Sequence, residues 1–245
     1  MSGRPLPAGA QASSSARYYI AEVKDHDHGQ AQTAAHAEHM QAAPRTWEPM
    51  REINPRTMHS GQETYEVTRF PNAKQPTAEQ RRLADQLIEQ SRASAKRHGW
   101  FEYENAARDG FNLLPADNIH YVNRAFALDD VQLDPDRPEF LLYLDTPAGK
   151  RLAAFMFLAR GPEDHGAQVG GPLTLWHYHA WIDPVCLLER RIVIGFSDRS
   201  GLCGNGIPMT RSPEMMHVWL IRNPGGPFAT SMSLTDDMRK ELTGR

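Results

Sequence analysis

The clearest hydrophobic pattern along the chain is helical and begins just after Thr77. In TAEQRRLADQLIEQSRASAKRHG, apolar and small side chains recur at the spacing of one helix face, at Leu83, Ala84, Leu87, Ile88, Ser91 and Ala95. Thr77 with Gln80 three residues later predicts a capping box, and Gly99 predicts the C-terminal end. We therefore expect a long amphipathic helix at 78–98, followed by a second, short one within YENAARDG (103–110).

Beyond residue 110 the hydrophobic pattern becomes that of strands. PEFLLYLDTPAGKRLAAFMFLA predicts a hairpin with strands at 140–144 and 152–158 and a turn at 147–149. Further elements expected are strands in LTLWHYH (173–179), RIVIGFS (191–197) and HVWLIR (217–222), and a short closing helix in SLTDDMRKEL (233–242) with Ser233 at its N-cap. Because helices and strands do not alternate, the predicted fold class is α+β: one or two N-terminal helices packed on a mainly antiparallel β-sheet or partial barrel.

The first 57 residues have a different composition from the rest. They are rich in Ala, Gln, Ser, Pro and His and nearly lack bulky aliphatic side chains after Val23, so they bury too little apolar surface to offset ordering entropy. We expect residues 1–57 to form a flexible Ala/His-rich tail or arm and residues 58–245 to form a single α+β domain. Within the tail, YYIAEV (18–23) could dock as a strand, and AQTAAHAEHMQAA (31–43) could form a marginal helix.

Composition and charge exclude several classes of function. The 245 residues carry 27 Lys and Arg against 30 Asp and Glu, a net charge of −3, so no basic surface favours a nucleic-acid partner. No apolar run approaches the ~18 residues that a membrane span requires. The phosphate-binding loop and the dinucleotide fingerprint are both absent, so we expect no nucleotide cofactor. A small molecule is left as a partner class, and the oligomeric state is left open.

The chemistry of the chain is concentrated in histidines. In LTLWHYH, the two-residue period of a strand places His177 and His179 on one face, together with Leu173 and Leu175. His217 in HVWLIR shares its face with Trp219 and Ile221. Neutral imidazoles from two neighbouring strands are common ligands of zinc, copper and non-haem iron. The pattern therefore predicts a transition-metal site formed by His177, His179 and His217.

Three softer candidate ligands lie near these histidines in the sequence. Cys186 and Cys203, which are 17 positions apart, could form a disulfide, bind the metal as thiolates or stay free thiols. Met216 could offer a thioether to copper, although a methionine beside a strand also serves core packing. The tail histidines His26, His28, His36 and His39 lie in a polar context and are expected to bind metal only loosely.

Two resemblances bear on this prediction. GPLTLWHYH is similar to the G-x5-H-x-H opening of the cupin metal motif, with Gly171 as the glycine, but Glu189 lies too far along to complete that motif. IHYVN (119–123), LDPDRPEFLLY (133–143) and HVWLIRNPGGPF (217–228) resemble, in order, three segments of a family of uncharacterised bacterial proteins that are mostly secreted or lipid-anchored. That resemblance adds His120 as a fourth candidate ligand. It implies an extracytoplasmic location, while the first residues, which lack the apolar core of a leader, leave a cytoplasmic one open.

Three functions follow from these patterns. The first is a soluble extracytoplasmic protein that binds one transition-metal ion, zinc or copper before iron, for metal binding, sensing or handover. The second uses the same ligands in a metal-dependent enzyme that hydrolyses or oxidises a small molecule. The third is a metal-free binding or assembly module in which the histidines are structural. The sequence does not decide whether a reaction is catalysed.

Overall fold

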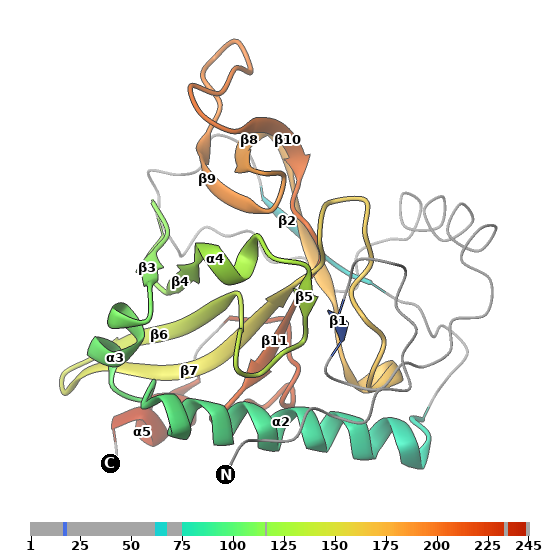
Figure 1. Ribbon diagram of the computed structural model, residues 1–245, viewed down its shortest axis with the longest axis vertical. Coiled ribbons are helices and arrows are strands. Elements are labelled where there is room, and N and C mark those ends of the chain that lie inside the picture. Colours follow the sequence, from blue (N-terminus) through green and yellow to red (C-terminus); the bar gives the residue numbers. More distant parts are fainter. Residues whose placement is uncertain (1–16, 19–61, 68–74, 116, 233–234, 244–245) are drawn as a thin grey trace.

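The computed structural model describes residues 17–18, 62–67, 75–115, 117–232 and 235–243 (Figure 1). The helix expected at 31–43, the four tail histidines and the expected cap Ser233 lie outside these residues. Of the arm expected at 18–23, only the start is described: the short strand β1 (Arg17–Tyr18) pairs in parallel with β5 (Val131–Gln132). The expected boundary at residue 57 is likewise not described.

Within the described residues, nine strands form one antiparallel sheet, in agreement with the expected mainly antiparallel architecture. Its strand order is β10-β8-β11-β7-β6-β4-β3, and β2 and β9 also pair with β8. The strands are β2 (Glu63–Glu66), β3 (Phe111–Leu113), β4 (His120–Asn123), β6 (Phe140–Thr146), β7 (Gly149–Leu158), β8 (His177–Leu188), β9 (Ile192–Phe196), β10 (Ile207–Arg211) and β11 (Met215–Trp219). The helices are few and mostly short: α2 (Ala78–His98), α3 (Tyr103–Arg108), α4 (Arg124–Ala127) and α5 (Asp236–Thr243).

Several local predictions are confirmed. Helix α2 begins with a capping box in which Thr77 and Gln80 bond each other's backbone N–H groups, and it ends at Gly99 in the left-handed conformation. The hairpin of β6 and β7 closes on a two-residue turn, because Thr146 pairs with Gly149. The short helix at 103–108 and the strand at 192–196 are also present.

The prediction for LTLWHYH is wrong in its first half. Gly171, with a φ of 55°, begins a short 3-10 helix (Gly171–Leu173), and β8 starts only at His177. Trp176 lies directly before the strand, and its ring packs against Gly166, where an added Cβ would lie 2.2 Å from that ring. The strand then continues through the Asp-Pro step at 183–184, where Pro184 O accepts from Ser197 N but neither residue has a register partner in the described ladders. Leu173 and Leu175 are therefore not strand neighbours of His177.

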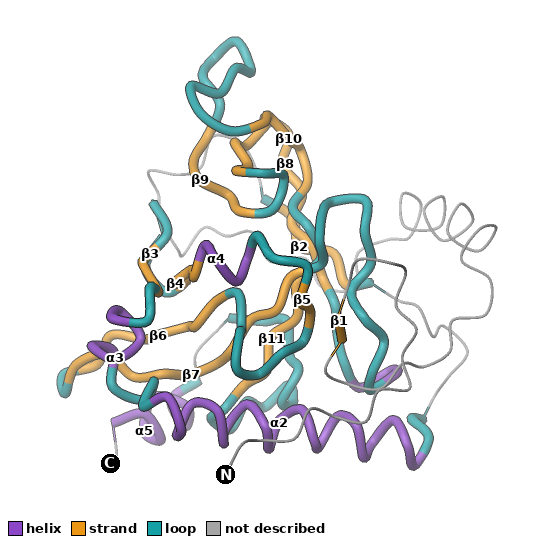
Figure 2. Tube along the Cα trace, viewed as in Figure 1, coloured by secondary structure: helices purple, strands orange, loops and turns teal. Residues whose placement is uncertain are grey.

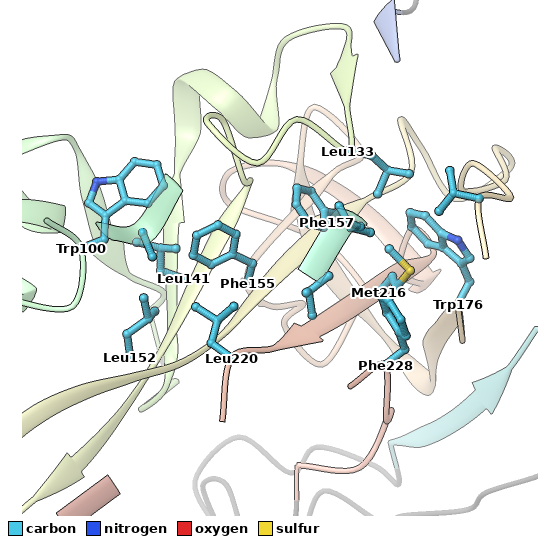
Figure 3. Packing of buried hydrophobic residues seen from close by; sticks show 14 of the residues in the cluster. Trp100, Leu133, Leu141, Leu152, Phe155, Phe157, Trp176, Met216, Leu220 and Phe228 are labelled. Atoms are coloured by element: carbon cyan, nitrogen blue, oxygen red, sulfur yellow. The ribbon is translucent and has the colours of Figure 1, made fainter. Parts of the chain in front are cut away.

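One face of the sheet and helix α2 share the main hydrophobic cluster. Leu83, Leu87 and Ala95 of α2 belong to the same buried cluster as residues of β6, β7 and β11. Figure 3 shows part of this cluster, with Phe155, Phe157 and Met216 between Trp100 and Trp176. In Figure 1, α2 runs along the lower side of these strands. Because side chains alternate along a strand, the residues between those that pack on α2 point to the other face of the sheet.

A second buried cluster lies on the opposite face of the sheet and is formed by the alternate side chains of the same strands. It contains Phe140 and Leu142 of β6, Met156 of β7, and Met215 and Trp219 of β11, with further residues from α4, β9 and α5. Strand alternation separates it from the first cluster, which takes Leu141, Phe155 and Met216. His217 lies between Met215 and Trp219 on this second face.

Strand β8 connects two parts of the molecule. Its first residues, His177 to Ala180, pair with β2, and His177 also pairs with β11. Its last residues pair with β9 and β10 in a projecting lobe, defined here as residues 183–211 (Figures 1 and 2). A disulfide between Cys186 and Cys203 ties the 197–206 loop of this lobe to β8.

Candidate functional site

Four histidines that are far apart in sequence converge on the second face of the sheet. They are His120 on β4, His177 and His179 on β8, and His217 on β11, and they are called the histidine cluster below. The ring centroids of His177 and His217 are 4.8 Å apart, and those of His177 and His179 are 5.5 Å apart. The sequence correctly predicts that His177 and His179 share a face, because both belong to β8 with one residue between them.

The four rings differ in exposure. His177 is 0% exposed and His217 1%, so they form the floor of the cluster. His120 is 9% exposed and His179 is partly buried, so these two lie nearer the rim. A small ion or molecule would therefore approach from the side of His120 and His179.

Three of the four rings are fixed through Nδ1. His120 Nδ1 donates to Asp117 Oδ2 at 2.8 Å, and His217 Nδ1 donates to the backbone carbonyl of Ala229 at 3.3 Å. His179 Nδ1 lies 2.9 Å from Thr64 Oγ1, a hydroxyl that can either donate or accept. Partners of this kind hold an imidazole in one orientation and leave Nε2 for another task.

His177 is the exception. Neither of its ring nitrogens has a hydrogen-bond partner among the described residues, although both are buried, and His217 Nε2 is also unpartnered there. A buried polar group without a partner costs about 1–3 kcal/mol. The unpartnered ring nitrogens at the floor of the cluster therefore lower the free energy of unfolding, and no hydrogen bond among the described residues offsets this cost.

Burial keeps the rings of His177, His179 and His217 neutral. Loss of solvation, together with the neighbouring histidines, places the pKa of His177 well below its usual value. Loss of solvation, followed by the effect of His120, lowers the pKa values of His179 and His217 to about 3 each. At neutral pH these three imidazoles are unprotonated, which is the form that binds a metal ion.

Asp117 is held as a carboxylate beside His120. Burial opposes its ionisation, but His120 and the N–H groups of Ile119 and His120 favour it and lower its pKa to about 2. Oδ1 accepts three backbone N–H bonds, from Asn118, Ile119 and His120, while Oδ2 accepts from the His120 ring. The sequence analysis missed Asp117, although an aspartate that precedes a short polar turn is a known turn signal.

Strand β2 contributes two further residues that the sequence analysis missed. Thr64 pairs with His179 and Glu66 pairs with His177 across the antiparallel β2–β8 ladder. Glu66 Oε1 accepts a hydrogen bond from Thr230 Oγ1 at 2.9 Å. The segment ETYE has too few apolar residues to mark it as a strand, so no sequence signal pointed to it.

Three candidate ligands do not belong to the cluster. Cys186 and Cys203 form a disulfide, so neither sulfur is a thiolate, and both lie in the lobe. Met216 points to the opposite face, because it alternates with His217 along β11 and packs in the cluster shared with α2 (Figure 3). The ligand alternative is therefore wrong for these residues, and the disulfide alternative for Cys186 and Cys203 is confirmed.

The rings are not already arranged as a metal site. Among the described side chains, no three histidine, cysteine, aspartate or glutamate residues surround one point as ligands would. A pocket of about 310 Å³ opens between the lobe and the rest of the molecule, but none of the four histidines lines it. Its walls are formed by Pro115, Arg124, Cys186, Ile194, Gly195, Phe196, Gly204 and Asn205.

Another histidine, the partly buried His165, belongs to a separate network. His165 Nδ1 lies 2.8 Å from Glu214 Oε1, and Glu214 Oε2 accepts from the backbone N–H of Gly166 at 3.0 Å. Glu214 is fully buried at the start of β11. These bonds attach the 159–176 loop to the sheet, which is a structural role.

Comparisons with known proteins give no indication of a family or a function. None of the described helices is long and apolar enough to cross a membrane. No known family model, no curated protein and no solved structure matches the chain.

Proposed function

We propose that this protein binds one transition-metal ion through His177, His179 and His217, with His120 as a fourth ligand, and serves in metal binding, sensing or handover. The observation that carries the proposal is His177, whose two buried ring nitrogens have no partner among the described residues. A bound cation would give one of these nitrogens a partner and remove much of the cost of burying the ring.

The protonation and orientation of the rings support this function. Metal ligation requires neutral imidazoles, and the lowered pKa values of His177, His179 and His217 provide them at neutral pH. The Nδ1 partners of His120 and His217 leave Nε2 as the coordinating atom. A carboxylate or carbonyl on the other ring nitrogen is the usual outer shell of a metal-bound histidine.

The spacing of the rings suits one shared ion. Two imidazoles that bind a metal through Nε2 at about 2.1 Å have centroids about 4.5–5.5 Å apart for ordinary coordination angles. The centroid separations of 4.8 and 5.5 Å around His177 lie in this range. Since the rings do not yet surround one point, binding requires at least the His177 ring, which no hydrogen bond holds among the described residues, to turn about its χ1 and χ2 angles.

A curved sheet accounts for the convergence. Three strands separate β4 from β8 in the sheet order. At about 4.8 Å between neighbouring strands, a flat sheet would place them about 19 Å apart. His120 nevertheless influences the pKa values of His177, His179 and His217. We infer that the sheet bends as a partial barrel around the cluster.

We further propose an extracytoplasmic location. The disulfide between Cys186 and Cys203 is of a kind that persists in oxidising compartments. This agrees with the resemblance to secreted and lipid-anchored proteins carried by the segments at 119–123, 133–143 and 217–228.

Elemental analysis of the purified protein tests the metal proposal. The full chain with His26, His28, His36 and His39 replaced by alanine removes tail binding, and we expect it to retain about one zinc or copper ion per chain after dialysis. His177→Ala in this background should lose the ion, whereas His98→Ala, a histidine outside the cluster, should keep it. A full complement of metal in His177→Ala would overturn the proposal. Displacement of a bound water by added small molecules would favour the enzymatic form of the same site.

A further inference from the structure

Strand β2 brings a carboxylate to the histidine cluster. Thr64 and Glu66 lie on one face of β2 and pair with His179 and His177 respectively. The 2.9 Å contact between Thr64 and His179 shows that side chains paired on this face touch. Directly paired residues have Cβ atoms about 4.5–5.5 Å apart, so Glu66 and His177 are neighbours as well.

The Glu66 carboxylate is also held from the side of His217. Its Oε1 accepts from Thr230 Oγ1 at 2.9 Å. Thr230 follows Ala229, whose carbonyl accepts from the His217 ring. Glu66 is therefore connected to both floor histidines through neighbouring segments: it pairs with His177 across the ladder, and it bonds to the residue after Ala229, the partner of His217.

His177 and Glu66 do not hydrogen-bond to each other, in contrast to two other histidine–carboxylate neighbours among the described residues. Elsewhere a carboxylate beside a buried or half-buried histidine accepts directly from its ring, as Asp117 does from His120 and Glu214 from His165, each at 2.8 Å. His177 is fully buried and has no such partner among the described residues. Glu66 is paired directly with His177 across the ladder, and its carboxylate oxygens and the unpartnered ring nitrogens of His177 are both lone-pair donors for a cation.

We infer that Glu66 supplies a carboxylate oxygen to the ion bound by the histidine cluster and thereby selects borderline divalent metals over Cu(I). The inference rests on the proposed function and identifies the class of metal. Carboxylate oxygen suits Zn²⁺ and Fe²⁺, whereas Cu(I) prefers sulfur and imidazole nitrogen. Its negative charge also offsets part of a divalent charge in a site that is otherwise made of neutral rings.

Parallel titrations with Zn²⁺ and Cu(I) test this inference. Both ions are titrated in competition with a chelator into the full chain that lacks the four tail histidines, with and without Glu66→Gln. We expect Glu66→Gln to weaken Zn²⁺ binding by about 10- to 100-fold and to leave Cu(I) affinity unchanged within about threefold. Glu63→Gln is the matched control on the other face of β2, and it should bind both ions like the parent.

A second variant keeps the test decisive if Glu66→Gln does not fold. Glu66→Asp keeps the charge but withdraws the carboxylate by one methylene, and it should weaken Zn²⁺ binding and not Cu(I) binding. Unchanged Zn²⁺ affinity, or an equal loss of both ions, would overturn the role of Glu66. If His177→Ala still abolishes metal binding in that case, the proposed function stands. If no variant or parent binds either ion, the proposed function itself fails.

Discussion

At the residue scale, the buried ring of His177 is expected to destabilise the metal-free protein while it contributes to metal binding. Its two ring nitrogens have no partner among the described residues, and replacing such a group by an apolar side chain of similar size removes an unfavourable term. We predict that His177→Leu raises the free energy of unfolding of the metal-free protein by about 1–3 kcal/mol while abolishing zinc binding. Urea denaturation in the presence of a chelator measures the first effect. A loss of stability in that buffer would mean that His177 has a structural partner.

Asp117 allows a separate test at the same scale. Asp117→Asn keeps the shape of the side chain, and its carbonyl oxygen can still accept the backbone N–H bonds. It loses the charge that accepts from His120 Nδ1. Because outer-shell partners orient and strengthen a ligand, we expect zinc affinity to fall by about 10- to 100-fold, as measured by chelator competition. Asp145→Asn is the control, since Asp145 is exposed and pairs with Lys150 in the hairpin. Equal affinities in both variants would remove His120 from the ligand set.

At the element scale, the strength of local sequence signals explains which elements could be predicted. Helix α2 carries its cap, periodicity and terminal glycine within one segment, and the β6–β7 hairpin carries its turn between two apolar runs, so both were predictable. Strand β2 has no such signal, because its position depends on pairing with β8 more than 110 residues later. The start of β8 was misplaced because Gly171–Leu173 forms a 3-10 helix, although Leu173 and Leu175 fit the alternation of a strand with His177 and His179.

The candidate site follows the same division. His177, His179 and His217 were predictable because alternation along a strand determines the face of a side chain. Their partners Thr64, Asp117 and Glu66 come from other segments, and only the sheet order brings Thr64 and Glu66 next to the histidines. Met216 was wrongly considered because sequence proximity to His217 placed it near, while alternation along β11 turns it away.

Glu139 contacts both β4 and β7, and its carboxyl group makes the free energy of unfolding depend on pH. It lies directly before β6, its carbonyl accepts from Asn123 of β4, and its buried side chain interacts with the backbone N–H of Leu158 at the end of β7. Loss of solvation raises the pKa of this carboxyl well above its usual value, despite favourable backbone N–H groups. The folded state therefore holds a proton that the unfolded state releases near pH 4.5. This contribution to stability is fully present below pH 4.5 and is lost as pH rises through the folded-state pKa.

We predict from this sign that Glu139→Gln stabilises the protein at high pH only. Glutamine resembles the protonated glutamic acid, so wild type and variant should unfold at similar urea concentrations at pH 4. At pH 8 the variant should be more stable, by about 1.4 kcal/mol for each unit by which the wild-type pKa is raised. Other titrating groups are common to both proteins and cancel in the difference. A variant that is less stable than wild type at pH 8 would show that the carboxylate has favourable partners.

At the scale of the whole molecule, the two halves of β8 have different roles: the first carries histidines of the cluster and the second forms part of the lobe. Its first residues lie in the body, where pairing with β2 and β11 holds His177 and His179 in the cluster. Its last residues lie in the lobe, where pairing with β9 and β10 and the Cys186–Cys203 disulfide hold the projecting loop. Among the described strands, positions 181–184 between the two halves have no partner in the ladder registers, and Pro184 O accepts a single backbone bond from Ser197 N at 3.1 Å. The base of the lobe is joined to the body, because Ile192 of β9 packs in the second cluster and Arg211 of β10 pairs with Ala180. The disulfide-linked loop at 197–206 is therefore the part of the lobe that should respond separately from the site.

Removal of the disulfide tests this separation. The bond spans 17 positions, so in the chain-entropy model its loss costs about 3 kcal/mol, and the lobe should bear most of that cost. We predict that replacing Cys186 and Cys203 by serine increases hydrogen exchange of backbone amides at 197–206, while exchange in β6, β7 and β11 changes little. Zinc affinity should stay within about threefold of the parent, because the paired strands around His177 and His179 are unaffected. Equal loss of protection in body and lobe, accompanied by loss of zinc, would instead mean that the two parts unfold as one unit and that the lobe supports the site.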